Sequence, residues 1–378
     1  MTAVRFRFIQ QPSHVRAYLS SLASHHTFAI DLEADSLYSY PEKLCLVQLS
    51  TPAENVILDP LRAGDSLQGL WEALADGSIQ KILHGGDYDV RLLKKEFGIE
   101  LHNVVDTMIA SQLAGHQRVG LADLLQEELC VHLDKRFQRA NWSRRPLPED
   151  MLRYAALDTA YLLPLWQRLR DQLSQLGRLH WAQEEFELLE QVSPPAEQPP
   201  SCFDVKGAHK LSPRQRAVLQ ALVELRERVA WAWGRPPFKV LGNQVLLKWA
   251  QSPPANHQDI LETRAANRGT LRRLASEILA AVSSAKSKPV RDCPQRHHAS
   301  RPPLTSKQNR LLRSLKKARQ TAAQRLGLHV GLLVNTRTLE TLARVEPAQA
   351  ADELQSHLKR WQLEALGAQL LRVLQEQN

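Results

Sequence analysis

The stretch FAIDLEAD, residues 28–35, places three carboxylates on a run that otherwise has the apolar character of a β-strand. Asp31, Glu33 and Asp35 are each two residues apart, so an extended chain directs all three to one side of a sheet. An ionised carboxylate without a partner is costly to bury. We therefore expect these acids either to be solvated at a strand end or to be held by something cationic.

Strand and helix patterns are mixed around this stretch, up to about residue 190. Three successive apolar segments predict a run of strands of the kind that forms a meander. Amphipathic segments after them predict helices, with a further strand between the first two helices. The strands are expected at 27–33, 44–50, 55–60 and 80–85, and the helices at 66–76, 89–98, 121–129 and 149–173. This order predicts an α/β domain built on a mixed sheet flanked by helices.

Two segments rich in proline, serine and polar residues, 192–201 and 283–306, are typical of linkers. They divide the chain into predicted domains at 1–195, 205–285 and 303–378. The second and third blocks have all-helical patterns of the same plan, because VLGNQVLLKWA at 240–250 and LLVNTRTLETLA at 332–343 follow a long helix at the same relative place. We interpret them as two small all-α domains related by a degenerate repeat.

Charge is unevenly distributed over the 378 residues, whose formal net charge is +9. Residues 1–200 contain 19 Lys and Arg against 27 Asp and Glu, whereas residues 201–378 contain 30 against 13. A basic second half is expected to bind a polyanion, with nucleic acid as the first candidate.

The four cysteines are scattered and predict neither a disulfide framework nor a zinc ribbon. The sequence has no membrane-length apolar run and no apolar signal core. We therefore expect a cytoplasmic protein with no membrane association.

Acids from other segments can converge on the acidic strand. Asp89 lies at the start of the helix that follows QKILHGGDY, and Tyr154 and Asp158 are four residues apart on one predicted helix face. Two strand acids and two helix acids can hold two divalent cations, the arrangement used for in-line phosphoryl displacement. Oxygen ligands of this kind suit Mg²⁺ or Mn²⁺.

The triple DLE, LHGGDYD and YAALD resembles the three sequence motifs of the DEDD exonucleases, in the subclass with tyrosine in the third motif and above all in ribonuclease D. The resemblance implies a ribonuclease H-like α/β domain with 3′ to 5′ exoribonuclease activity on structured RNA such as tRNA precursors, releasing nucleoside 5′-monophosphates. It also implies that Asp31 bridges two metal ions, Glu33 and Asp158 complete the site of the ion that activates water, and Asp89 holds the second ion. Tyr154 would orient or deprotonate the attacking water.

Neighbouring residues have plainer interpretations. We prefer Asp89 over Asp87 as the motif acid. We expect Asp35 to be a solvated loop residue and Asp106 a helix cap. Tyr161 is expected in the core, and His84 is expected to be a packing or hydrogen-bonding residue. Arg144 and Arg145 are candidates for phosphate contacts, with a loop-fixing salt bridge as the equal alternative. Leu37 is a candidate wedge against the terminal base, with a core role as the default.

The second block resembles the HRDC domain, a helical module associated with nucleic-acid binding, and the third block resembles it more weakly because Gly331 replaces the proline element. The partners expected are RNA 3′ ends, gripped by the site and by the basic half, although such domains also act as spacers or protein-docking modules. A DNA 3′ to 5′ exonuclease of repair and a catalytically inactive RNA-binding protein are the alternatives. The sequence after Glu33, Ala34 and then DSLYSY, resembles nuclear exosome exonucleases and argues against a role confined to tRNA.

Overall fold

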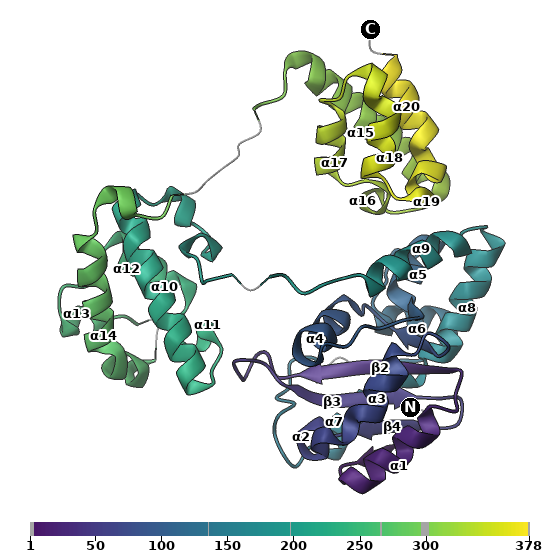
Figure 1. Cartoon of the computed structure of the whole chain (residues 1–378), viewed down its shortest axis with the longest axis horizontal. Helices are drawn as coiled ribbons and strands as arrows, with labels where there is room; N and C mark the ends of the chain where they lie inside the picture. Colours follow the sequence, from purple (N-terminus) through teal and green to yellow (C-terminus); the bar gives the residue numbers. More distant parts are fainter. Residues whose placement is uncertain (1–3, 135, 197, 265–266, 296–301, 377–378) are drawn as a thin grey trace.

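The computed structural model describes residues 4–134, 136–196, 198–264, 267–295 and 302–376. It contains an α/β domain followed by two helical domains (Figure 1), which confirms the predicted fold class. Within these described residues, no helix is long and apolar enough to cross a membrane. The cytoplasmic location stays a prediction.

The α/β domain is built on a six-stranded mixed sheet with the order β1-β4-β3-β2-β5-β6. Strands β2, β3 and β4 form the expected antiparallel meander, and β1, β5 and β6 add parallel pairs at the two edges. The sequence patterns did not reveal the short edge strands β1 and β6. The strands are β1 (Arg7–Ile9), β2 (Thr27–Ala34), β3 (Leu44–Ser50), β4 (Asn55–Leu58), β5 (Gln80–Leu83) and β6 (Val104–Asp106).

Helices cover both faces of this sheet. Helices α1, α3 and α4 enclose one apolar core with the sheet, while α5, α7, α8 and α9 pack on the other face. The single long helix expected at 149–173 is broken at Tyr161 into two helices. The helical elements are α1 (Pro12–Leu22), α2 (Pro60–Ala63), η1 (Gly64–Leu67), α3 (Gln68–Ala75), α4 (Asp87–Phe97), α5 (Thr107–Ala114), α6 (Leu121–Leu129), α7 (Glu149–Ala160), α8 (Leu162–Gln175) and α9 (Leu179–Glu190).

The middle domain has its own core around the long helices α10 and α14. Ser212 caps α10 with a reciprocal capping box, and Gly234 ends it in the left-handed conformation. Helix α14 continues to Ser287, so the segment predicted as linker from 283 is helical at its start. The elements are η2 (Cys202–Asp204), η3 (Ala208–Lys210), α10 (Pro213–Trp233), α11 (Pro237–Val240), α12 (Asn243–Gln251), α13 (His257–Leu261), α14 (Arg268–Ser287) and η4 (Val290–Asp292).

The third domain repeats this plan and docks on the α/β domain beside α9 (Figure 1). One apolar core runs through both bodies, and Trp361 stacks on Trp181 with ring centroids 5.3 Å apart. Glu185 accepts hydrogen bonds from the Trp361 indole and from Lys359, each at 2.6 Å. The elements are α15 (Ser306–Leu326), α16 (Val330–Leu333), α17 (Thr336–Leu342), η5 (Pro347–Gln349), α18 (Ala350–His357), α19 (Arg360–Gln362), the π-helical η6 (Leu363–Gly367) and α20 (Ala368–Gln375).

Candidate active site

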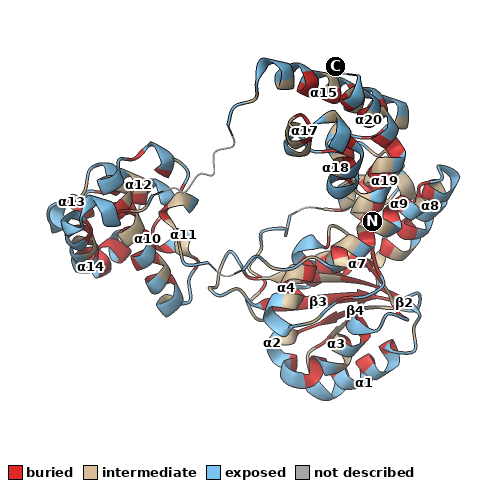
Figure 2. Ribbon diagram, turned by 45° about the horizontal axis from the view of Figure 1, so that its top comes forward, coloured by how far each residue is buried: buried red, intermediate tan, exposed pale blue. Residues whose placement is uncertain are grey.

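Strand β2 places two acids on one face of the sheet. Phe28, Ile30 and Leu32 alternate into the core shared with α1, α3 and α4. Buried residues are red in Figure 2, where the sheet strands are largely red. Because side chains alternate along a strand, Asp31 and Glu33 point to the opposite face, where α7 lies. The register of the β2–β3 pair shifts between Glu33 and Ala34, which pairs with Leu44 at the end of the strand.

Helix α7 brings a third carboxylate to the same point. The helix packs across β3 and β4, and a 2.7 Å hydrogen bond between the hydroxyls of Ser50 and Thr159 joins it to the sheet. Carboxylate oxygens of Asp31, Glu33 and Asp158 consequently lie within 4.8 Å of one another. The predicted strand and helix acids therefore meet in space, although they are more than 120 residues apart in the sequence.

Asp89 lies in the first turn of α4, where its charge acts on Glu33, but it is outside the group of three carboxylates whose oxygens lie within 4.8 Å. A tight turn before α4 sets its position. The carboxylate of Asp106 accepts hydrogen bonds from the backbone N–H groups of Gly85 and Gly86, at 3.0 and 2.7 Å. Gly85 has a φ of 70°, and a Cβ on Gly86 would lie 2.6 Å from a methyl carbon of Leu83, so the turn requires both glycines. Asp106 also caps α5, as the sequence predicted.

Asp87 and Asp89 have different surroundings. Asp89 is 8% exposed, and its pKa is raised well above the usual range by burial and then by the charges of Asp31 and Asp106. The side chain of Asp87 is 60% exposed and pairs with Arg91 at 2.8 Å. The geometry therefore agrees with the preference for Asp89 as the site acid.

Crowding of the carboxylates perturbs their protonation. Burial raises the pKa of Asp31 to about 7. The pKa of Glu33 rises to about 10, first by burial and then by repulsion from Asp31, Asp158 and Asp89. Burial and the charge of Asp31 also raise the pKa of Asp158 well above its ordinary value. Binding of a cation relieves the repulsion between these carboxylates and stabilises their ionised form.

The residue opposite Asp31 fits the same conclusion. Gln48 pairs with Asp31 across the β2–β3 ladder, so the two side chains share a face, and Gln48 is fully buried. Neither the amide oxygen nor the amide nitrogen of Gln48 has a hydrogen-bond partner within the described part of the chain. Carboxylate oxygens beside an unsatisfied amide suit a hydrated, hard divalent cation, whose waters can supply the missing partners. Sequence reasoning did not single out Gln48, since its only signal is its place opposite Asp31.

Tyr154 stands one helical turn before Asp158, and aromatic neighbours fix its ring. The ring stacks near Trp142 at 6.2 Å and meets Phe137 edge-on at 5.7 Å. Burial, and then the charges of Asp158 and Glu33, raise the pKa of the phenol, so it keeps its proton at neutral pH.

A cavity of about 330 Å³ opens beside Tyr154. It is large enough for a small ligand and mixes aromatic, cationic and acidic side chains. Several of its lining residues come from the 130–137 loop, where the sequence carries no recognisable pattern, and were not predicted as site residues. They include His132, Asp134, Arg136 and Phe137, and Arg153 and Tyr161 complete the wall from the α7 side. Tyr161 also packs against the core, as expected.

The two candidate phosphate ligands differ. Arg145 binds the fully buried Asp59 through two hydrogen bonds of 2.7 Å and donates further to the carbonyls of Trp142 and Cys45. These contacts favour the loop-fixing interpretation of Arg145. Arg144 is exposed and stays a candidate for contact with RNA.

Two expectations about the segment after β2 are wrong. Asp35 is 1% exposed rather than solvated, because it accepts hydrogen bonds from the backbone of Lys43 and the hydroxyl of Ser39 and so closes the 35–43 loop. Leu37 is 41% exposed, so the default core role does not apply. His84 bonds to Thr107 at 3.0 Å, as a structural residue would.

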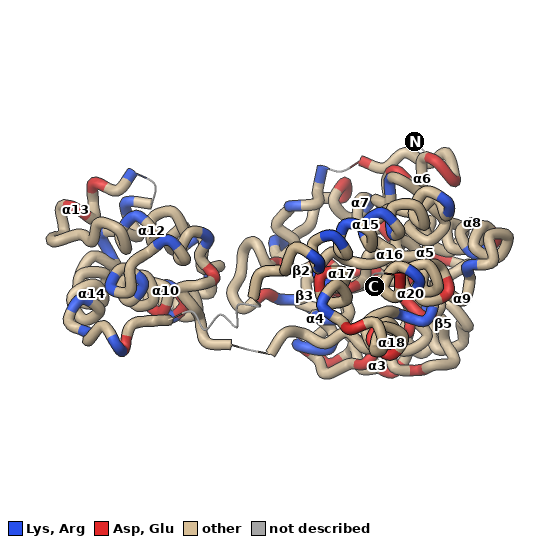
Figure 3. The backbone as a smooth tube through the Cα atoms, turned by 90° about the horizontal axis from the view of Figure 1, so that it is seen from above, with Lys and Arg blue, Asp and Glu red and all other residues tan. Residues whose placement is uncertain are grey.

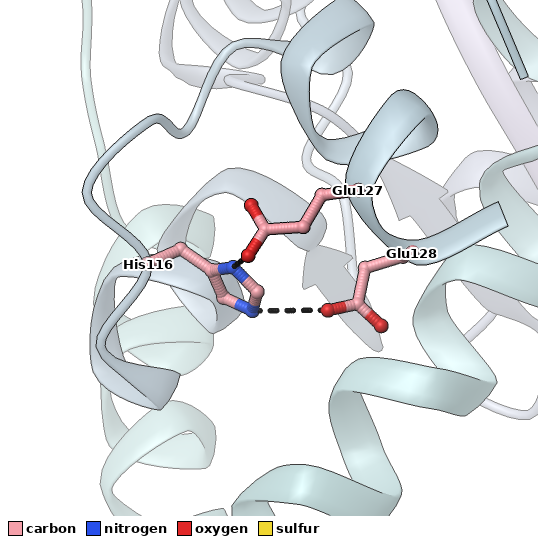
Figure 4. Close-up of side chains that lie close together, drawn as sticks. All are labelled: His116, Glu127 and Glu128. Atoms are coloured by element: carbon pink, nitrogen blue, oxygen red, sulfur yellow. Dashed lines mark ion pairs between the residues drawn. The ribbon is translucent and has the colours of Figure 1, made fainter. Parts of the chain in front are cut away.

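A second cluster consists of His116, Glu127 and Glu128 (Figure 4) and shares no residue with the first. Glu127 lies 3.3 Å from Nδ1 of His116 and Glu128 lies 3.4 Å from Nε2. Because the carboxylates approach opposite ring nitrogens, one ion cannot replace both contacts. Gln172 further joins the His116 ring to Glu128. We interpret the cluster as an interhelical brace.

Comparison with known proteins identifies the domains. Residues 6–174 match the family model described as 3′-5′ exonuclease, and residues 215–282 and 308–374 each match the HRDC domain. The chain belongs to the DEDD 3′-5′ exonucleases of the ribonuclease D type. This agrees with the motif resemblance and with the tandem helical domains.

Relatives of two kinds resemble this ribonuclease D-type chain. Exosome complex component 10 of Rattus norvegicus is 34% identical over 67% of the chain, and the chain spans only about 30% of that relative. Ribonuclease D of Jannaschia is 28% identical over 97% of the chain and 94% of the relative. The crystal structure of Escherichia coli RNase D, titled as an exoribonuclease involved in structured RNA processing, is 26% identical with a TM-score of 0.73 and 99% coverage of both chains. A Bifidobacterium adolescentis protein reaches a TM-score of 0.84 at 25% identity, covering 97% of this chain and 96% of its own.

Proposed function

We propose that the protein removes nucleotides from RNA 3′ ends by hydrolysing the terminal phosphodiester bond, with two divalent cations and release of nucleoside 5′-monophosphates. The observation that carries this proposal is the convergence of Asp31, Glu33 and Asp158 within 4.8 Å, with the buried Asp89 near enough for its charge to act on Glu33. Membership of the exonuclease family supports the reaction class. The RNA substrate is supported by relatives named as ribonuclease D and as an exosome component.

The four carboxylates hold the cations in this scheme. Asp31 would serve both ions, Glu33 and Asp158 would help to hold the ion that activates water, and Asp89 would hold the other. Bound there, Mg²⁺ or Mn²⁺ would lower the pKa of a coordinated water and neutralise charge on the phosphate and the leaving 3′ oxygen. The chain contributes a fixed arrangement of ligands, since Asp31 and Glu33 lie on a strand of the sheet, α4 shares the apolar core on one face of the sheet, and α7 packs on the other face.

Tyr154 positions the attacking water rather than deprotonating it. Its pKa is raised, so at neutral pH the hydroxyl carries a proton and can donate or accept one hydrogen bond. Stacking on Trp142 and an edge-on contact with Phe137 hold that ring, and with it the hydroxyl, in one place. The cavity beside Tyr154 is a candidate pocket for the terminal nucleotide.

Structured RNAs such as tRNA precursors are the substrate class we propose. The E. coli structure, similar over 99% of both chains, is titled for structured RNA processing. The exosome component shares more identity over a shorter span, so we do not confine the substrate to tRNA.

Digestion of 5′-labelled RNA and sequence-matched DNA tests the proposal. Wild-type protein with Mg²⁺ should shorten the RNA one nucleotide at a time from the 3′ end and release 5′-monophosphates, and EDTA should stop the reaction. Asp31→Asn should be inactive on both substrates. Equal RNA shortening by wild type and Asp31→Asn would disprove the site. Faster digestion of the DNA than of the RNA would favour the alternative function, a DNA 3′ to 5′ exonuclease of repair.

A further inference from the structure

The 35–43 loop, which follows Glu33 in β2, connects the active site to the middle domain. Its base is fixed by Asp35, and Glu42 in the loop accepts a short hydrogen bond from Tyr88, the residue before Asp89. The loop extends from β2 and β3 toward α10 and α11 (Figure 1). One continuous segment therefore reaches from the catalytic carboxylates to a second domain.

Two tyrosines of this loop contact the middle domain. The Tyr40 ring meets Trp231 edge-on at 6.2 Å, and the Tyr40 N–H donates to the carbonyl of Gly234 at 3.3 Å. The ammonium of Lys239 lies 4.1 Å from the centre of the Tyr38 ring. The contacts place the end of α10 and the start of α11 beside the exonuclease domain.

The middle domain exposes large aromatic side chains at this point. Trp231 is 66% exposed and Phe238 is 54% exposed, the two highest values among the large apolar side chains described. Exposed apolar side chains of this size that gather at one place mark a binding surface more often than a structural one. Cationic side chains accompany them, since Lys239 adjoins Phe238, and Arg235 with Arg273 lines a nearby cavity of about 390 Å³.

We propose that Tyr38, Tyr40, Trp231, Phe238 and Lys239, here called the loop surface, bind the single-stranded part of the RNA upstream of the bond being cleaved. Aromatic faces among cations are the chemistry that binds single strands, because bases stack on the rings and phosphates pair with the cations. The excess of Lys and Arg in the second half of the chain, seen along α10, α12 and α14 in Figure 3, complements a polyanion. The inference rests on the proposed function for its substrate and adds where that substrate runs.

Substitution of both exposed rings tests the loop surface. Trp231→Ala combined with Phe238→Ala should raise KM at least about tenfold on a 20-nucleotide single-stranded RNA, since each stacked base contributes about five- to a hundredfold to affinity. Cleavage of a trinucleotide should be unchanged, because this substrate is too short to extend from the active site to the loop surface. Lys239→Gln should lower the salt dependence of binding by about one counterion.

Phe97→Ala is the matched control, because Phe97 is 40% exposed, stacks on Trp71 and lies at the far end of α4 from Asp89. This variant should leave the KM on the 20-nucleotide RNA and the cleavage of the trinucleotide unchanged. RNA carrying a single 5-iodouridine upstream of the 3′ end should form photocrosslinks to peptides containing Trp231 or Phe238, which a merely structural role would not produce.

An unchanged KM on long RNA, or an equal loss on the trinucleotide, would overturn the inference while leaving the exonuclease intact. If wild-type protein cleaved neither RNA, the proposed function would fail, and binding of the 20-nucleotide RNA measured by fluorescence anisotropy would still decide the loop surface. A surface that docks another protein instead would show unchanged RNA affinity and no crosslink.

Discussion

Without metal, the carboxylate cluster should destabilise the folded protein as pH rises. Asp31 has an ordinary pKa of 3.8 that burial raises to about 7, a shift of about three units. At about 1.4 kcal/mol per unit, Asp31 alone lowers the free energy of unfolding by about 4 kcal/mol between its two pKa values. The sign follows because the folded state binds more protons than the unfolded state between about pH 4 and pH 7. The raised pKa of Glu33, about 10, extends the loss to higher pH.

Urea unfolding followed by tryptophan fluorescence, in EDTA and in Mg²⁺ at pH 5 and pH 8, measures this effect. Wild type in EDTA should lose a few kcal/mol from pH 5 to pH 8 and recover it with Mg²⁺. Asp31→Asn should show a shallower pH slope, because it removes one carboxylate and relieves Glu33, and should lose most of the Mg²⁺ response. Asp87→Asn, an exposed carboxylate in a salt bridge, is the control and should behave as wild type. Equal pH slopes and equal Mg²⁺ responses in wild type and Asp31→Asn would refute the reasoning.

Three further outcomes follow from the site. Asp89→Asn should reduce turnover by about a hundredfold or more and Asp87→Asn by less than about twofold, because Asp89 is buried and interacts with the charge of Asp31 whereas Asp87 is exposed and paired with Arg91; similar losses in a single-turnover assay would be inconsistent with this. Tyr154→Phe should lower kcat by about ten- to a hundredfold with unchanged thermal stability, since the stacked ring is retained; an unaffected kcat would remove its role. Arg145→Met should cost up to about 3–5 kcal/mol in urea unfolding, since the buried carboxylate of Asp59 then keeps, among the described residues, only a 3.3 Å hydrogen bond from Gln10 and a 3.9 Å contact with the exposed Arg62; unchanged stability with weaker RNA binding would restore the phosphate-contact interpretation.

Local patterns predicted the parts of the site that depend on one segment. The alternation in FAIDLE put Asp31 and Glu33 on one face, and helical spacing put Tyr154 next to Asp158. Those rules hold within a strand or helix regardless of the rest of the chain. The meander of β2, β3 and β4 was predictable for the same reason, because strands close in sequence pair readily.

Partners distant in the sequence were not predictable from these patterns. Arg145 pairs with Asp59, and Gln48 lies opposite Asp31, because the folded domain brings together segments that are distant in the sequence. We expected Asp35 to be solvated because acids that follow a strand usually are. Two hydrogen bonds within the loop instead offset the cost of burying its carboxylate.

The docking of the third domain also depends on tertiary contacts. Nothing local to Trp361 shows that it packs on Trp181, or that the N–H groups at the start of α19 are capped by Glu184 of another domain. Residues whose roles depend on such contacts could be assigned only from the structure.

Anomalous scattering from crystals of the full chain soaked with Mn²⁺ and a short non-hydrolysable RNA tests the central claim most directly. Two Mn²⁺ peaks about 4 Å apart are expected, one against Asp31, Glu33 and Asp158 and the other against Asp31 and Asp89. No Mn²⁺ peak among these four carboxylates, or a single peak at His116 instead, would contradict it.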